Sequence, residues 1–258
     1  MEMMLTKEDL LKLFKKNGIQ KGMVVMVESK GMMTNYIAGG EQMVIEVLKE
    51  LIGSQGCILA PSFTFDTLDP ATDGEYHYDY SLWEEVRNST IGYDKKISQS
   101  NDGFANQLLR NPESGRSTHP VYSFVMLGRY DQKQLRQGMN FPISLHDVLS
   151  PLAERKSCLI VFDGQIEKSC FFHALAQQSD QQDVFVQRAY KKHGKEKEIH
   201  TFLMNRPHTG LIRQFLNGSN LNSFEIQDHD IEFCSFDMRH DKRWATPSKK
   251  TMSSKEKR

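Results

Sequence analysis

The sequence has 258 residues, enough for one large α/β domain with a substantial core or for two small domains. Hydrophobic residues make up 38% and charged residues 26%, a balance typical of globular proteins. The 33 Lys and Arg residues match the 33 Asp and Glu residues, so the chain lacks the basic excess of a nucleic-acid-binding protein. No apolar run approaches the roughly 20 residues of a membrane span. We therefore expect neither a nucleic acid nor a membrane as a partner.

The N-terminal residues 1–14 carry Glu2, Glu8 and Asp9 and lack the apolar centre of a signal peptide, so we expect a cytoplasmic protein. Four cysteines are widely spaced without a CxxC pair, which predicts neither a zinc site nor a disulfide framework. His229 has an aspartate on each side and could bind a metal, but an Asp-rich turn is the simpler interpretation. No metal is predicted.

The first 60 residues predict helix, strand, helix and strand. Thr6 followed by Asp9 marks the start of a helix that Gly18 ends. Residues 23–27 are a short apolar run typical of a buried strand, and 57–60 form a second one. Between them, residues 41–51 carry apolar side chains at helical spacing. This βαβ order predicts a parallel strand pair in a sheet covered on both faces.

Residues 66–102 are polar and rich in Asp and Tyr, and predict a long surface excursion with room for short helices. The basic stretch 188–197 contains glutamate as well, which favours a solvated loop. The tail 246–258 is rich in Ser and Lys and is predicted to be disordered. Further helices are predicted at 104–110 and 169–178, and strands at 121–127, 159–162, 185–190, 198–203 and within 224–236.

These elements predict one α/β domain over residues 1–245, strand-rich from about residue 180. We expect a three-layer α/β/α architecture whose central sheet is mixed and partly parallel. The strands after residue 180 either extend this sheet or form a subdomain beside it.

Three segments occur in the order and spacing of one known family. The first runs from Val27-Glu28-Ser29-Lys30 through Gly39-Gly40 to Ala60-Pro61-Ser62-Phe63-Thr64-Phe65-Asp66. The second is Arg116-Ser117-Thr118-His119-Pro120-Val121-Tyr122-Ser123-Phe124. The third is Ser150-Pro151-Leu152, an apolar strand and a helix with His173. Over roughly residues 5–180 the chain resembles the antibiotic N-acetyltransferases, whose best-known members acetylate the 3-amino group of aminoglycosides.

The resemblance implies an acetyl-CoA-dependent N-acyltransferase with His173 as general base. Acyl transfer to an amine needs a base, donors for the developing oxyanion and two aligned substrates. The family carries its histidine in an Asn-Thr-x-x-His-x-x-Glu pattern. Here Ser169 and Cys170 stand at the Asn-Thr positions and Ala176 at the Glu position. The chain thus lacks a carboxylate that the family has.

The resemblance also implies CoA contacts at Ser29, Lys30, Gly39 and Gly40. A glycine pair at the start of a helix allows close approach and offers backbone N–H groups to an anion. The family has His-Ser-Ser where this chain has Glu28-Ser29-Lys30, so Lys30 could pair with a CoA phosphate or point to water.

Ser123 and Phe124 could line an acyl-CoA tunnel together with His119, which could instead be hydrogen-bonded to its own loop. Asp66, at the end of a strand, could hold a cationic amine or be a solvated acid. It begins an acidic cluster that would suit a polycationic acceptor: Asp66, Asp69, Asp73, Glu75 and Asp79.

The acceptor is predicted to be a small-molecule amine, either an aminoglycoside or an amino sugar nucleotide, and the protein could be a homodimer. A competing hypothesis is a degenerate, non-catalytic member that binds a ligand. Cys170 lies three residues before His173 on one helical face, which leaves a Cys–His hydrolase as a third reading.

Overall fold

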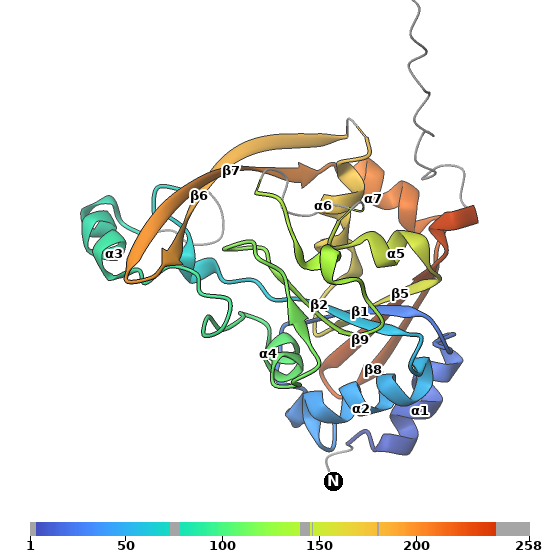
Figure 1. Cartoon of the computed structure of the whole chain (residues 1–258). Helices are drawn as coiled ribbons and strands as arrows, with labels where there is room; N and C mark the ends of the chain where they lie inside the picture. The colour runs from blue at the N-terminus through green and yellow to red at the C-terminus, as the bar shows by residue number, and fades with distance from the viewer. Residues whose placement is uncertain (1–3, 73–77, 140–144, 146, 180, 241–258) are drawn as a thin grey trace, which may run out of the picture.

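A seven-stranded sheet runs through the part of the chain that the computed structural model describes, residues 4–72, 78–139, 145, 147–179 and 181–240 (Figure 1). Its strand order is β3-β4-β2-β1-β5-β9-β8. The strands are β1 (Val24–Ser29), β2 (Cys57–Pro61), β3 (Gly115–Arg116), β4 (Phe124–Gly128), β5 (Ser157–Phe162), β8 (Asn220–Ile226) and β9 (His229–Phe236).

The centre of the sheet is parallel and its flanks are antiparallel. β1 pairs in parallel with β2 and with β5, whereas β4 joins β2 and β9 joins β5 in antiparallel register. This confirms the predicted mixed, partly parallel sheet. The carboxyl ends of β1, β2 and β5 meet at one edge, the place where α/β sheets commonly bind ligands.

Helices cover both faces of the sheet, which confirms the predicted three layers (Figure 1). One face carries α1 (Lys7–Lys16), α2 (Gly40–Ile52) and α4 (Gly103–Leu109). The other carries α5 (Ser150–Glu154), α6 (Phe171–Ala176) and α7 (Thr209–Leu216), of which α5 and α7 were not predicted. Thr6 and Asp9 form the capping box expected at the start of α1.

A long hairpin arches away from the main sheet toward α3 (Trp83–Ser89), which lies in the excursion 66–102 (Figure 1). Its strands are β6 (Gln182–His193) and β7 (Glu196–Pro207). The prediction of a solvated loop over 188–197 is therefore wrong, because pairing along the hairpin continues to His193 and Glu196. Of the late strands, β8 and β9 extend the main sheet, and β6 and β7 stand apart from it.

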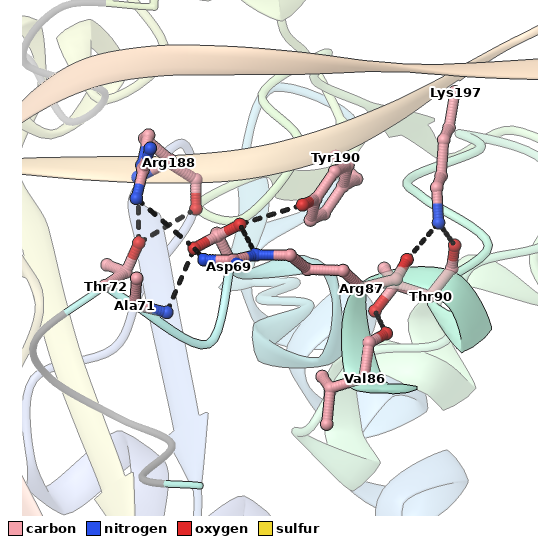
Figure 2. Close-up of polar contacts among 9 residues, drawn as sticks. All are labelled: Asp69, Ala71, Thr72, Val86, Arg87, Thr90, Arg188, Tyr190 and Lys197. Atoms are coloured by element: carbon pink, nitrogen blue, oxygen red, sulfur yellow. Dashed lines mark hydrogen bonds and ion pairs between the residues drawn. The ribbon is translucent and has the colours of Figure 1, made fainter. Parts of the chain in front are cut away.

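The far end of this hairpin is pinned by Asp69, whose carboxylate is buried (Figure 2). Arg87 donates to it from Nε at 3.0 Å and from Nη2 at 3.2 Å, and the Tyr190 hydroxyl donates at 2.8 Å. Arg188 completes the group with an Nη2–Oδ1 distance of 3.5 Å. Nearby, the ammonium group of Lys197 donates to the Thr90 carbonyl at 2.8 Å. Asp69 thus joins the excursion to the hairpin.

No helix in the described residues has the length and apolar character needed to cross a membrane. The tail predicted to be disordered, 246–258, lies outside the described residues.

Candidate functional site

His173 projects from α6 against the end of β7, where Asn205 holds its ring. The Nδ1 atom lies 2.8 Å from the Asn205 carbonyl oxygen and 3.2 Å from its Oδ1. The Asn205 amide nitrogen donates to the His173 carbonyl and to Gln182 Oε1, each at 2.7 Å. These two bonds fix the orientation of the Asn205 amide, so that its oxygen faces the imidazole.

Both atoms that face Nδ1 only accept hydrogen bonds, so Nδ1 carries the ring proton and Nε2 keeps its lone pair. Burial lowers the pKa of His173, against the raising effect of the Asn205 contacts. The imidazole is therefore neutral near pH 7. A neutral imidazole held in one tautomer is what a general base requires.

Helix α6 sits where it does because five of its six residues are completely buried. Ala176 is one of them and lies in the core, where a longer acidic side chain would have no space. The position of the family's glutamate is thus part of the packing here, and the histidine takes its partner from β7. Sequence reasoning missed Asn205 because it lies 32 residues from His173. The available signal was an amide directly after Phe202-Leu203-Met204.

At the other end of α6, Glu28 of β1 meets Ser169 and Cys170. Glu28 Oε1 accepts from Ser169 Oγ at 2.5 Å and from the Cys170 N–H at 3.2 Å. Burial raises the pKa of Glu28 to about 7. Burial and the neighbouring Glu28 also keep the pKa of Cys170 well above its usual value, so its thiol is neutral. Because the Cys170 sulfur contacts Glu28 at 3.5 Å, the geometry does not support a Cys–His nucleophile.

Ser29, a predicted CoA contact, is bound to Asp102, which sequence reasoning did not identify. The Ser29 N–H donates to Asp102 Oδ2 at 2.8 Å and its hydroxyl donates to Oδ1 at 3.1 Å. Asp102 also caps α4 by accepting from the Ala105 N–H at 2.9 Å. Burial raises the pKa of Asp102 to about 6.

Gly39 and Gly40 open α2 at the same sheet edge. Their φ angles are +86° and +54°, and a Cβ on Gly40 would lie 2.5 Å from Thr34 Cγ2. The glycine pair is therefore required by the turn itself, and the Gly40 N–H already donates to Ile37 at 2.9 Å. Gly39 and Lys30 are exposed, so a backbone surface and a cation remain available there to an anionic ligand.

The structure gives Ser123, Phe124 and His119 structural roles. Phe124 is fully buried, and Ser123 Oγ donates to the Ser62 carbonyl at 2.7 Å. His119 Nδ1 accepts from the N–H groups of Val121 and Tyr122 at 3.1 and 3.0 Å. Burial lowers the pKa of His119 to about 3, so it is neutral. Contact of these three residues with an acyl chain stays a prediction.

Asp66 is exposed on the wall of a cavity of about 780 Å³ that Glu85, Leu82 and Ile91 also line. The cavity lies beside α3, whereas His173 lies in α6 at the other end of the hairpin (Figure 1). The structure therefore does not bring Asp66 together with His173. Asp69 is taken up by the hairpin contacts, and two other members of the acidic cluster, Asp73 and Glu75, lie outside the described residues.

His229 is also bound within the protein. Its Nδ1 lies 2.8 Å from Asp163 Oδ1, and its ring stacks on Tyr36 with centroids 4.0 Å apart. Over the described ranges, no three His, Cys, Asp or Glu side chains gather as metal ligands.

Comparison with known proteins identifies relatives over most of the chain. The family model for aminoglycoside 3-N-acetyltransferases matches residues 26–237. The aminoglycoside N(3')-acetyltransferase-like protein YokD of Bacillus subtilis is 30% identical over 172 residues, 65% of this chain and 63% of that protein. Aminoglycoside N(3)-acetyltransferase IX of Micromonospora chalcea is 30% identical over 120 residues, 43% of this chain and 40% of that enzyme. The matched segments thus span less than two thirds of these relatives.

Solved structures share the fold. The crystal structure of YokD superposes with a TM-score of 0.74 at 21% identity, over 91% of this chain and 89% of that one. AAC-IIIb, solved with CoASH, gives a TM-score of 0.71 at 14% identity, over 90% of this chain and 92% of that one. The family match, the ordered sequence blocks and the shared fold agree. The chain belongs to the aminoglycoside 3-N-acetyltransferase family.

Proposed function

We propose that the protein transfers an acetyl group from acetyl-CoA to an amine of an aminoglycoside or amino sugar, with His173 as general base. The observation that carries this proposal is the 2.8 Å contact between Nδ1 and the Asn205 carbonyl, which leaves Nε2 free to accept a proton. A base of this kind contributes roughly 10²–10⁴-fold to a rate.

In this mechanism the acceptor amine attacks the acetyl carbonyl while its proton passes to Nε2 of His173. The Asn205 carbonyl then faces the Nδ1–H of an imidazolium and stabilises its charge. Acetyl-CoA supplies the activated acyl group, and a C–N bond replaces the C–S bond as the CoA thiolate leaves and takes the proton back from the imidazolium. Orientation of the two substrates supplies much of the remaining acceleration.

The residues at the carboxyl edge of the sheet fit an anionic CoA. Exposed Lys30 would pair with a phosphate, and Gly39 would allow close approach beside the start of α2. Ser29 and Gly40 would act by placing the chain beside the ligand, because their N–H groups and the Ser29 hydroxyl already donate within the protein.

The test is release of free thiol from acetyl-CoA in the presence of a panel of aminoglycosides and amino sugar nucleotides. We expect release that depends on an acceptor, and the productive acceptors define the substrate class. Lys30→Ala should raise the KM for acetyl-CoA with little change in kcat. If none of these acceptors supports thiol release by the wild type, the proposed transfer is contradicted.

The degenerate, non-catalytic reading rests on Ala176, which removes the family's carboxylate, and on Glu28 in place of its histidine. Calorimetric titration with CoA distinguishes this hypothesis from the transferase. Binding together with acceptor-dependent thiol release supports the transferase, and an absence of both supports a binding protein.

A further inference from the structure

The helix that bears His173 is short and depends on contacts at both ends. α6 has six residues, and Cys170 at its N-cap makes no side-chain capping bond. Isolated helices of this length are unstable in water, so neighbouring elements must hold α6 in place. Asn205 holds the side of His173, as described above. The N-terminal end must be held by another group.

Glu28 makes polar contacts at that end. Its Oε1 accepts from Ser169 Oγ at 2.5 Å and from the Cys170 N–H at 3.2 Å. Ser169 Oγ in turn accepts from the Phe171 N–H at 3.2 Å. One carboxyl group thus reaches two of the N–H groups at the start of α6, one directly and one through a hydroxyl.

The carboxyl group is itself held by a rigid element. Glu28 is paired with Val161 on β5, and β1 lies in the middle of the sheet between β2 and β5. The family has histidine at this position, and an imidazole offers at most one acceptor. A carboxylate oxygen can accept more than one hydrogen bond, so Oε1 accepts from Ser169 and Cys170 together, while Oε2 lies 3.5 Å from the Cys170 nitrogen.

We infer that Glu28 is a positioning residue that docks α6 on the central sheet and so places His173 for catalysis. The inference deepens the proposed function and rests on it for the role of His173. The docking itself can be measured without any substrate.

Protonation of Glu28 gives the docking a pH dependence. Burial is the main cause that raises its pKa to about 7, and the negative charge of nearby Asp102 adds to it. The other titratable group that faces it is the Cys170 thiol, which stays neutral. When α6 undocks, Glu28 regains water and its ordinary pKa of 4.5. The docked state therefore binds more protons between pH 4.5 and about 7, and docking weakens as the pH rises through this window.

The experiment is amide hydrogen exchange of residues 170–176 in the full chain, at several pH values, for wild type, Glu28→Ala and Glu28→Gln. Alanine leaves the Ser169 hydroxyl and the Cys170 N–H without their acceptor, so exchange should be roughly tenfold faster or more. Glutamine keeps an acceptor oxygen and cannot ionise. It should preserve protection and abolish its pH dependence. The matched control is Glu167→Ala, which removes an exposed carboxylate two residues before Ser169.

Kinetics complete the test. In Glu28→Ala we expect kcat for thiol release to fall roughly tenfold with the KM for acetyl-CoA nearly unchanged, and Glu28→Gln should restore most of kcat. Exchange in Glu28→Ala equal to that of Glu167→Ala would overturn the inference. So would faster exchange spread evenly over β1 and β5, since this indicates general destabilisation. Because exchange needs no substrate, failure of the docking and failure of the proposed transfer are separate outcomes.

Discussion

The β1–α2–β2 unit and the β6–β7 hairpin are held in place by different interactions. α2 buries Val44, Val47 and Leu48 completely against the sheet. The hairpin leaves Val184 and Val186 about half exposed, at 47% and 57%, and depends at its far end on the polar contacts of Asp69. The first region is stabilised by apolar burial. The second is positioned by a few charged and polar groups that are far apart in sequence.

Leu48→Ala should have the largest effect on stability. It leaves a cavity in the layer between α2 and the sheet, and we expect a loss of about 3 kcal/mol in the free energy of unfolding. Urea denaturation would measure it, and all parts of the main sheet should lose stability together. Glu46→Ala on the exposed side of the same helix is the control, with an expected change under about 0.5 kcal/mol. Similar losses in both variants would show that α2 is not held by its buried face.

Asp69→Ala should act on the hairpin rather than on the sheet. It leaves Arg87 and Tyr190 without their acceptor, and we expect the local free energy of unfolding of the hairpin to fall by roughly 2–3 kcal/mol. The loss is not larger because Arg87 and Arg188 are both partly solvated. Hydrogen exchange should accelerate in β6 while β1 and β5 stay protected. Uniform acceleration across β1, β5 and β6 would mean that the two regions unfold as one unit.

Gly40→Ala tests the turn that leads into α2. The variant combines a φ of +54° with a Cβ placed 2.5 Å from Thr34, so we expect a loss of about 2 kcal/mol. Gly18→Ala is a matched control, since Gly18 has a φ of +81° and no atom within 4 Å of the added Cβ. The difference between the two unfolding free energies measures the close approach. Equal values would show that backbone conformation alone requires glycine at position 40.

Asn205→Ala tests the site end of the hairpin. The backbone carbonyl that faces Nδ1 remains, but the side-chain bonds to His173 and Gln182 are lost, so kcat should fall about tenfold and the free energy of unfolding by about 1–3 kcal/mol. Steady-state thiol release and urea unfolding would be measured on the same variant. A fall in stability without a fall in kcat would assign Asn205 to the hairpin alone.

The two regions also differ in how far the sequence predicts them. The signals for β1, α2 and β2 are local in sequence: short apolar runs such as 23–27 for the strands and the spacing of Val44, Ile45 and Leu48 for the helix. These elements were therefore predicted close to their observed bounds. α7 carried a similar signal in Leu211, Phe215 and Leu216, but it is only eight residues long. The hairpin was predicted only in part, because the Asp69–Tyr190 contact joins residues 121 apart.

The candidate site follows the same rule. His173 was singled out as a candidate base by the family pattern on its own helix. The contacts that Asn205 and Glu28 make with α6 could not be predicted, since these residues reach α6 from strands 32 and 141 residues away. Ala176 lacks the carboxylate of the family pattern, and in this fold Asn205 of β7 holds the histidine.

The most direct test of the proposed mechanism compares wild type with His173→Ala in acceptor-dependent thiol release at neutral pH. With His173 as the base, kcat/KM should fall roughly 10²–10⁴-fold while calorimetry shows CoA binding preserved. Unchanged turnover in His173→Ala would contradict the assignment and place the base on another residue.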